Sequence, residues 1–181
     1  MTRIKILERG DMNEEQGKVY DDVKAAGGPL GGPYWAYIRN PALMRLAQDV
    51  SNTLRASDLS NRERQIAVLT VVRHWDGQYP WAVQVKASLA AGVDQEIVDA
   101  INARQTPPLT DAREKAAYKV AGELLADRGL SDATYAEAAE LFGDEQLVAL
   151  VAVIGQFSMV CCTANAFDVT PPDAEPARLV D

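Results

Sequence analysis

Residues 62–101, RERQIAVLTVVRHWDGQYPWAVQVKASLAAGVDQEIVDAI, contain a series of segments of helical length. Ser60 and Glu63 form a capping box at the start of the first segment. Pro80 suits the first position of the second helix, and Asp94 is a good cap for the third. The predicted helices span 60–75, 80–92 and 94–103. Short turns separate them, so this stretch predicts helices packed closely against one another.

The same signals recur along the rest of the chain. Asn13 and Gln16 form another capping box, and Asn40 stands before a proline at a further helix start. Apolar residues then repeat with a helical period, and the sequence has no clear alternation of apolar and polar residues typical of β-strands. Helices are predicted over 13–27, 40–54, 110–128, 131–143 and 144–167. We therefore expect an all-α, single-domain helical bundle over 1–170, followed by a Pro-rich acidic tail over 171–181 that is loosely ordered.

Composition argues against several classes of partner. The chain has 181 residues and a net charge of −8. Nucleic acids and anionic membrane surfaces attract Lys and Arg, so neither is expected as a partner. The N-terminus shows no secretory h-region. A disulfide between the adjacent Cys161 and Cys162 would be strained, so we expect a cytoplasmic protein with reduced thiols. We interpret these cysteines as core residues, with a redox pair as the alternative.

The longest apolar run is 147–162, LVALVAVIGQFSMVCC. It contains Gly, Gln and Ser and is shorter than a membrane span, so we interpret it as a buried helix. Ala149, Ala152 and Gly155 would allow close approach of another helix. A helix that is apolar on most faces lies at a core centre or between subunits, so we expect a homo-oligomer.

The stretch 73–84, RHWDGQYPWAVQ, is the candidate site and holds the only histidine. The free N–H groups at the start of the following helix could bind a small carboxylate or enolate. His74 could act as acid or base near neutral pH, or it could simply bond a carbonyl at its own helix end. Tyr79 and Trp81 flank the face that carries Gln84.

Other residues have both functional and structural interpretations. Tyr34 and Trp35 could form an apolar wall of a pocket, or could pack beneath a Gly/Pro-rich loop. Glu63 could be a general base, or could serve only its capping box. The sequence has no zinc-ligand spacing and no phosphate-binding glycine motif, so no metal or cofactor is expected.

Residues 62–101 resemble the carboxymuconolactone decarboxylase family, which includes the alkylhydroperoxidase D-like proteins. LERGDMNEEQGKVYDDVKAAG (7–27) is similar to its N-terminal helix, GGPYWAYIRNPALMRLAQ (31–48) to its Gly-Pro-aromatic loop and second helix, and LVALVAVIGQFSMVCCTANAFDVTPP (147–172) to its terminal helix. The resemblance implies an all-helical subunit that assembles into trimers or hexamers, with pockets near the central motif.

The resemblance also implies functional positions. The peroxidase branch has two cysteines, a histidine and an upstream glutamate, which fall by register on Gly77, Pro80, Gln84 and Gln65. None matches, and thiol peroxidase chemistry needs a thiolate, so we reject that activity. A branch without cysteines has RHW, a tyrosine, Glu-Trp and a histidine. Here RHW, Tyr79 and Trp81 are kept, whereas Pro80 and Gln84 replace the glutamate and the histidine.

The first functional hypothesis is a cofactor-free lyase, decarboxylase or isomerase that acts on a small acidic or lactone-like metabolite. Gln84 and Tyr79 would orient the substrate, and His74 would move the proton. The expected substrate-binding residues are Trp81, Gln65, Tyr34 and Trp35. The alternative is a non-catalytic small-molecule-binding or scaffold protein, because all four functional positions of the peroxidase branch differ here.

Overall fold

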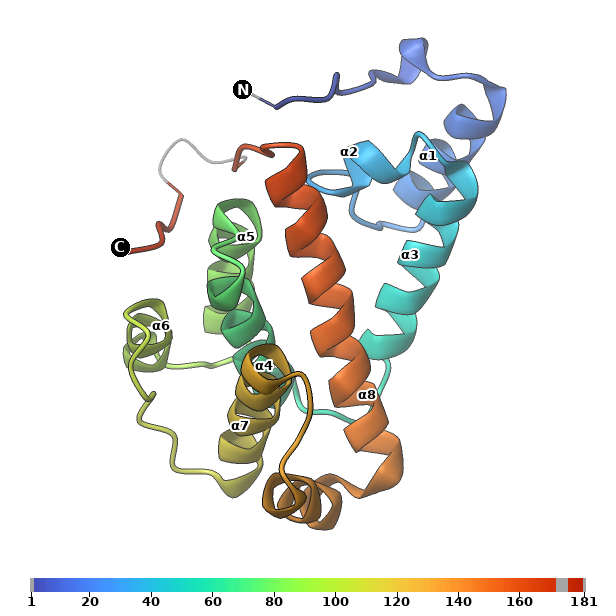
Figure 1. Cartoon of the computed structure of the whole chain (residues 1–181). Helices are drawn as coiled ribbons and strands as arrows, with labels where there is room; N and C mark the ends of the chain where they lie inside the picture. Colours follow the sequence, from blue (N-terminus) through green and yellow to red (C-terminus); the bar gives the residue numbers. More distant parts are fainter. Residues whose placement is uncertain (1, 172–175, 181) are drawn as a thin grey trace.

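The computed structural model describes residues 2–171 and 176–180. This part of the chain contains eight α-helices, one 3-10 helix and no strand, which confirms the predicted all-α class. The elements are η1 (Arg9–Asp11), α1 (Glu14–Ala25), α2 (Tyr34–Tyr37), α3 (Pro41–Arg55), α4 (Asn61–His74), α5 (Gln78–Ala90), α6 (Gln95–Asn102), α7 (Ala112–Asp127) and α8 (Asp132–Ala166). Figure 1 shows α8 running between a group formed by α1, α2 and α3 and a group formed by α4 to α7.

The predicted caps fix where the helices begin. The Asn13 side chain accepts a hydrogen bond from the Gln16 N–H at 2.9 Å, and Ser60 accepts one from the Glu63 N–H at 3.1 Å. Both capping boxes are completed by the reciprocal bond. The Asn40 side chain caps α3 by accepting from the Leu43 N–H, without a reciprocal side-chain bond. These starts were predictable because each is decided by residues three apart.

Two local features differ from the prediction. Helix α5 begins at Gln78, two residues before the predicted start at Pro80. A proline is tolerated in this first turn, because the first four N–H groups of a helix have no partner within it. The N-cap, Gly77, offers no side-chain hydrogen bond. Residues 34–37, expected as loop, form the single turn α2.

Helix α8 has a break and an apolar second part. Gly143 interrupts it with φ 65° and ψ 173°, which confirms the predicted boundary at this residue. An 18-residue window of α8 has a mean hydropathy of 2.1, and one third of that window is buried. By length and composition alone α8 could cross a membrane, although core helices of soluble proteins meet the same criterion. Its buried side chains, among them Leu150 and Val153, join the main core.

The molecule has two hydrophobic cores. The larger is built mainly from α4 to α8. The smaller lies among α1, α2 and α3, and consists of Val19, Val23, Tyr37, Ile38, Met44 and Ala47. A hydrogen bond of 3.1 Å between the hydroxyls of Tyr37 and Thr163 joins the small core to α8. The seam between the two cores is where the candidate site lies.

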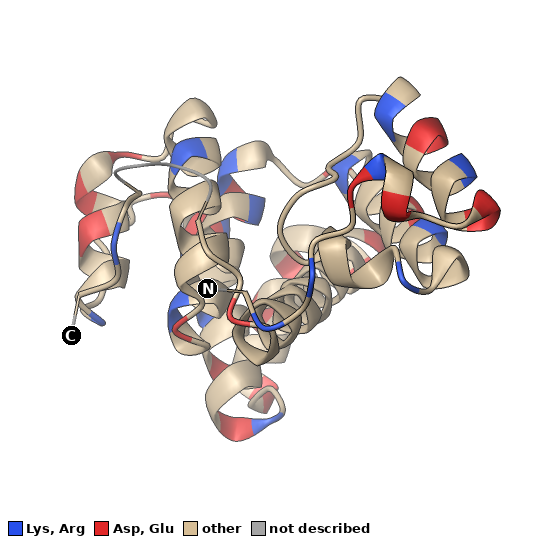
Figure 2. Ribbon diagram, turned by 90° about the horizontal axis from the view of Figure 1, so that it is seen from above, with Lys and Arg blue, Asp and Glu red and all other residues tan. Residues whose placement is uncertain are grey.

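Large apolar side chains are exposed on α3 and α8. On α8 they are Val148, Val151 and Met159, and on α3 they are Leu43, Leu46 and Val50. Residues 146–166, the second part of α8, carry no charged side chain, whereas Figure 2 shows that Lys, Arg, Asp and Glu are frequent on the outer helices. The expected homo-oligomer stays a prediction.

The C-terminal tail differs in part from the expected loose order. Residues 176–180 are held by hydrogen bonds to Gln78 and Asn102, which lie on α5 and α6. The expectation is therefore wrong for these five residues. Residues 172–175 and 181, which belong to the same predicted tail, lie outside the described part of the chain.

Candidate functional site

Two adjoining hollows lie along the seam between the cores. Their volumes are about 430 and 350 Å³, within the usual size range of small-molecule sites. They share the lining residues Ser51, Arg55, Gln84, Gln156 and Phe157. We call the two hollows together the Gln84 pocket.

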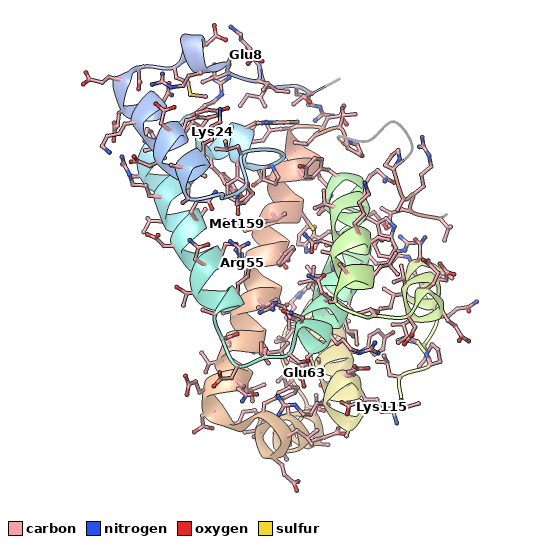
Figure 3. The ribbon with its side chains drawn as sticks, turned by 180° about the vertical axis from the view of Figure 1, so that it is seen from behind. Glu8, Lys24, Arg55, Glu63, Lys115 and Met159 are labelled. Atoms are coloured by element: carbon pink, nitrogen blue, oxygen red, sulfur yellow. The ribbon has the colours of Figure 1, made fainter. Side chains whose placement is uncertain are left out.

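Helices α3, α4, α5 and α8 form this pocket. In the view from behind, α3 and α5 stand on either side of α8, and Arg55 lies between α3 and α8 (Figure 3). The larger hollow adds Asn61, Arg64, Gln65 and Val68 of α4 and Val153 of α8. The smaller adds Tyr79, Pro80 and Val83 of α5, and the loop around Gly31 and Pro33. Residues far apart in the sequence thus meet in one cavity.

The only charged residues lining the Gln84 pocket, within the described chain, are Arg55 and Arg64. No described Asp or Glu lines either hollow, although the protein carries a net charge of −8. Neither arginine forms an ion pair with a described carboxylate, whereas Arg62 and Arg113 on nearby helices each do. The pocket therefore has a local positive charge that no described acid neutralises.

Arg64 is buried, with 8% of its surface exposed. Its guanidinium donates to the carbonyl oxygens of Leu54 at 3.1 Å and of Arg55 at 3.3 Å, and to the side-chain oxygen of Asn61. All of these acceptors are neutral. Burial, and then the positive charge of Arg55, lowers the pKa of Arg64. An anion bound in the pocket would favour the charged form of Arg64 and would therefore raise its pKa.

Amide side chains supply most of the remaining polarity. Gln84 lines both hollows, and Gln65 lies across the larger one on α4. Gln65 accepts a hydrogen bond of 3.0 Å from the Ser88 hydroxyl through its Oε1, which leaves its amide nitrogen as a donor. The structure thus brings together Gln65 and Gln84, which by the family resemblance stand where the peroxidase branch has its glutamate and histidine.

Tyr34 and Tyr79 line the smaller hollow. The Tyr79 ring packs against the Gly/Pro-rich loop so closely that a Cβ on Gly32 would lie 2.3 Å from it. Gly32 also has a φ of +63°, so glycine is required there by backbone and neighbour alike. Burial raises the pKa of Tyr34, although its hydrogen bond to Ser51 opposes this effect. The Tyr34 hydroxyl is therefore a proton-bearing donor at neutral pH.

Three of the predicted site residues lie elsewhere. His74 is exposed and lines a separate hollow of about 170 Å³ with Thr70 and Tyr118. Trp81 is only 1% exposed and belongs to the main core, so it cannot contact a ligand. Trp35 faces a fourth hollow, beside the N-terminal segment, with its ring centre 6.3 Å from that of Tyr79. Helical spacing put Trp81 beside Gln84 but could not tell which face was buried.

Glu63, the candidate base, and Asp76, the acid within the stretch 73–84, are both held in ion pairs. Glu63 is 5% exposed and accepts hydrogen bonds from Arg113 as well as completing its capping box. Burial would raise the pKa of Glu63, but the hydrogen bonds from Arg113 and the Ser60 N–H outweigh burial and hold it below its ordinary value. Asp76 pairs with Arg73 and with Arg104. Neither carboxylate lines the Gln84 pocket, so the structural interpretation of Glu63 is favoured.

The adjacent cysteines differ in environment. Both are free thiols, but Cys161 is buried in the main core and Cys162 is exposed. Burial raises the pKa of the Cys161 thiol to about 12, so it carries almost no thiolate at neutral pH. Its sulfur lies 3.2 Å from where a Cβ on Gly77 would stand. Cys161 therefore fills the space beside the start of α5 as an inert core residue.

Comparison with known families agrees with this architecture. Residues 41–123, from α3 into α7, match the family model described as the carboxymuconolactone decarboxylase family. This segment is a carboxymuconolactone decarboxylase family domain. It contains Arg55, Arg64, Gln65, Tyr79 and Gln84, so most of the pocket lies within it. No curated protein matches the chain.

Solved structures extend the fold similarity beyond that domain. An uncharacterized peroxidase-related protein from Silicibacter sp. TM1040 is 20% identical with a TM-score of 0.78, and the match covers 99% of this chain and 96% of that one. The alkylhydroperoxidase AhpD core protein from Ralstonia eutropha JMP134 is 16% identical with a TM-score of 0.76, over 95% and 93% of the two chains. The chain therefore has the AhpD-like fold along almost its whole length.

The pocket residues Arg55, Arg64 and Gln156 were not predicted from the sequence. Arg55 ends α3 and Gln156 lies in α8, so only the packing of distant helices places them together. Arg64 did have a local signal. It lies three and four residues before the buried Ala67 and Val68, on a helical face that apolar residues otherwise occupy. A cation at such a position needs a partner or a function.

Proposed function

We propose that the protein binds a small organic acid in the Gln84 pocket. The observation that supports this proposal best is the presence in one pocket of Arg55 and a buried Arg64, neither of which pairs with a described carboxylate. Guanidinium groups bind carboxylates through paired, charge-assisted hydrogen bonds. Gln84 and Gln65 would hold the polar part of the ligand, and Phe157 and Val83 would contact its apolar body.

The test compares each acid with its uncharged amide. Benzoate, butyrate and succinate are titrated by calorimetry beside benzamide, butyramide and succinamide. We expect at least one acid to bind and its amide to bind much more weakly. Equal affinity for acid and amide, or binding of none of the acids, would overturn the proposal.

A variant pair locates the bound charge. Arg55→Gln should weaken acid binding by about tenfold to a hundredfold, which corresponds to one lost charge-assisted contact. Arg45→Gln is the matched control, because Arg45 lies on the same helix but does not line the Gln84 pocket. Unchanged acid affinity in Arg55→Gln would contradict the assignment.

A lyase or isomerase is the second candidate function. It is favoured by the presence of tyrosine hydroxyls and guanidinium groups in one pocket. In a decarboxylation the C–C bond to the carboxylate would break, CO2 would leave, Arg55 would stabilise the enolate, and a tyrosine hydroxyl would protonate the enolate carbon and regain its proton from water. Turnover of an acid that binds, lost in Tyr34→Phe or Tyr79→Phe, would establish this activity. His74→Asn should leave such turnover intact, because His74 lies outside the pocket.

A further inference from the structure

The described part of the C-terminal tail, residues 176–180, crosses the end of α4, the start of α5 and the end of α6. Figure 1 shows this segment beside α5 and close to α6. Ala177 and Leu179 pack against the main core, while Arg178 and Val180 are exposed. We call residues 176–180 the strap.

Two amide side chains hold the strap from opposite sides. Gln78 donates to the Ala177 carbonyl at 2.8 Å and accepts from the Leu179 N–H at 3.1 Å. Asn102 donates to the Arg178 carbonyl at 3.0 Å and accepts from the Val180 N–H at 3.1 Å. Each amide therefore bonds a carbonyl and the N–H two residues later, as a neighbouring strand does.

A third contact secures the end of the strap. The Arg73 guanidinium donates to the Val180 carbonyl at 2.7 Å and to the Asn102 carbonyl at 2.6 Å. Arg73 is 5% exposed and belongs to the last turn of α4. Three helices thus bind the same short segment through its backbone.

The start of α5 depends on this contact more than most helix starts do. Its N-cap is Gly77, which offers no side-chain cap, and Pro80 contributes no N–H group to the first turn. Gln78 is the first residue of α5, and Tyr79, which lines the Gln84 pocket, is the second. A helix end without a cap frays easily unless other contacts hold it.

We propose that the strap is a positioning element that fixes the first turn of α5, and with it Tyr79, in the ligand pocket. Its effect on ligand affinity rests on the function proposed above. Release of the strap loosens the first turn of α5 and weakens binding. By linkage, a ligand that binds against Tyr79 favours the attached strap by the same factor.

Asn102→Ala is the decisive variant. It removes one amide clamp from α6: the side-chain hydrogen bonds of Asn102 go to the strap alone, and Asn102 does not line the pocket, so an effect on Tyr79 is expected to pass through the strap. Gln95→Ala is the matched control, because Gln95 is an amide on the same helix that bonds only Asp99.

Limited trypsin digestion of the full chain reports on strap release. Cleavage after Arg178 requires a detached backbone, and intact-mass spectrometry detects the loss of residues 179–181. We expect about tenfold faster cleavage in Asn102→Ala, because two hydrogen bonds of ordinary net strength are lost. Gln95→Ala should match the wild type. An unchanged rate in Asn102→Ala would overturn the proposal.

Hydrogen exchange over residues 78–84 tests positioning without any ligand. Faster exchange there in Asn102→Ala, with unchanged exchange in α7, is expected. Faster trypsin cleavage without faster hydrogen exchange over residues 78–84 would show that the strap does not stabilise the start of α5, and would overturn the proposal. Benzoate affinity, expected to fall about threefold in this variant, then tests the link to the pocket. If benzoate binds neither protein, the proposed ligand class fails for this acid, while the exchange result still decides the role of the strap.

Discussion

Glu63→Gln separates a structural glutamate from a catalytic one. The side chain of Glu63 is 7% exposed and accepts two hydrogen bonds from Arg113, at 2.5 and 3.2 Å, and one from the Ser60 N–H at 2.9 Å. Figure 3 shows Glu63 at the end of the molecule far from the α2 side, next to the α7 region that carries Lys115. Glutamine can still accept from Ser60 but cannot pair with the guanidinium.

The expected loss of stability follows from these contacts. Breaking a fully buried ion pair costs about 3–5 kcal/mol. The Arg113 side chain is 31% exposed and also bonds Gln146, so it would not be left without a partner. We therefore expect a loss of about 2 kcal/mol, which lowers Tm by about 4–8 °C in a domain of this size.

The pH dependence has a definite sign. The folded state holds the pKa of Glu63 below its ordinary value, so the stabilisation is fully present above the unfolded pKa and disappears as pH falls through the folded one. Thermal unfolding of wild type and Glu63→Gln should differ at pH 7, and the difference should shrink progressively as pH falls below the ordinary glutamate pKa of about 4.3. Glu96→Gln, in the first turn of α6, controls for the loss of a helix-start charge. Equal Tm values at pH 7, or a difference that persists in acid, would refute the reasoning.

Further predictions concern the loop, the thiols and the core. Gly32→Ala should unfold at a lower urea concentration than Gly27→Ala. Both positions have positive φ, but only a Cβ at Gly32 meets a neighbouring ring. Equal urea midpoints would show that the clash with Tyr79 does not destabilise the variant. Thiol titration of the native protein should leave Cys161 unreacted until denaturant is added, whereas Cys162 is exposed; rapid reaction of two thiols would contradict the burial of Cys161. Trp81→Ala should cost about 3–5 kcal/mol in urea unfolding, and a loss below 1 kcal/mol would mean that Trp81 is not a core residue.

The helices were predictable because local chemistry decides them. Asn13 with Gln16, Ser60 with Glu63 and the break at Gly143 each operate within a few residues, so the sequence alone places them. The start of α5 was misplaced because a proline is tolerated throughout the first turn of a helix, so Pro80 does not fix which residue comes first.

The pocket was only partly predictable. Gln65, Tyr34, Tyr79 and Gln84, which family register and aromatic clustering singled out, line the Gln84 pocket, and their roles stay predictions. Arg55 was not predicted as a site residue because no local sequence pattern around it indicates a functional role. The contribution of α8 depends on helix packing, which periodicity within one segment does not encode.

The packing around Gly77 restricts the order in which substitutions can be made there. A Cβ at position 77 would stand 2.7 Å from Cγ of Pro80, and a proline ring cannot rotate away. Gly77→Cys alone is therefore obstructed, whereas the same change after Pro80 has been replaced is not. The Cys161 sulfur, 3.2 Å from that Cβ position, would then be the nearest remaining neighbour of the new side chain. A pair of cysteines at positions 77 and 80 can therefore be introduced only if Pro80 is replaced before Gly77.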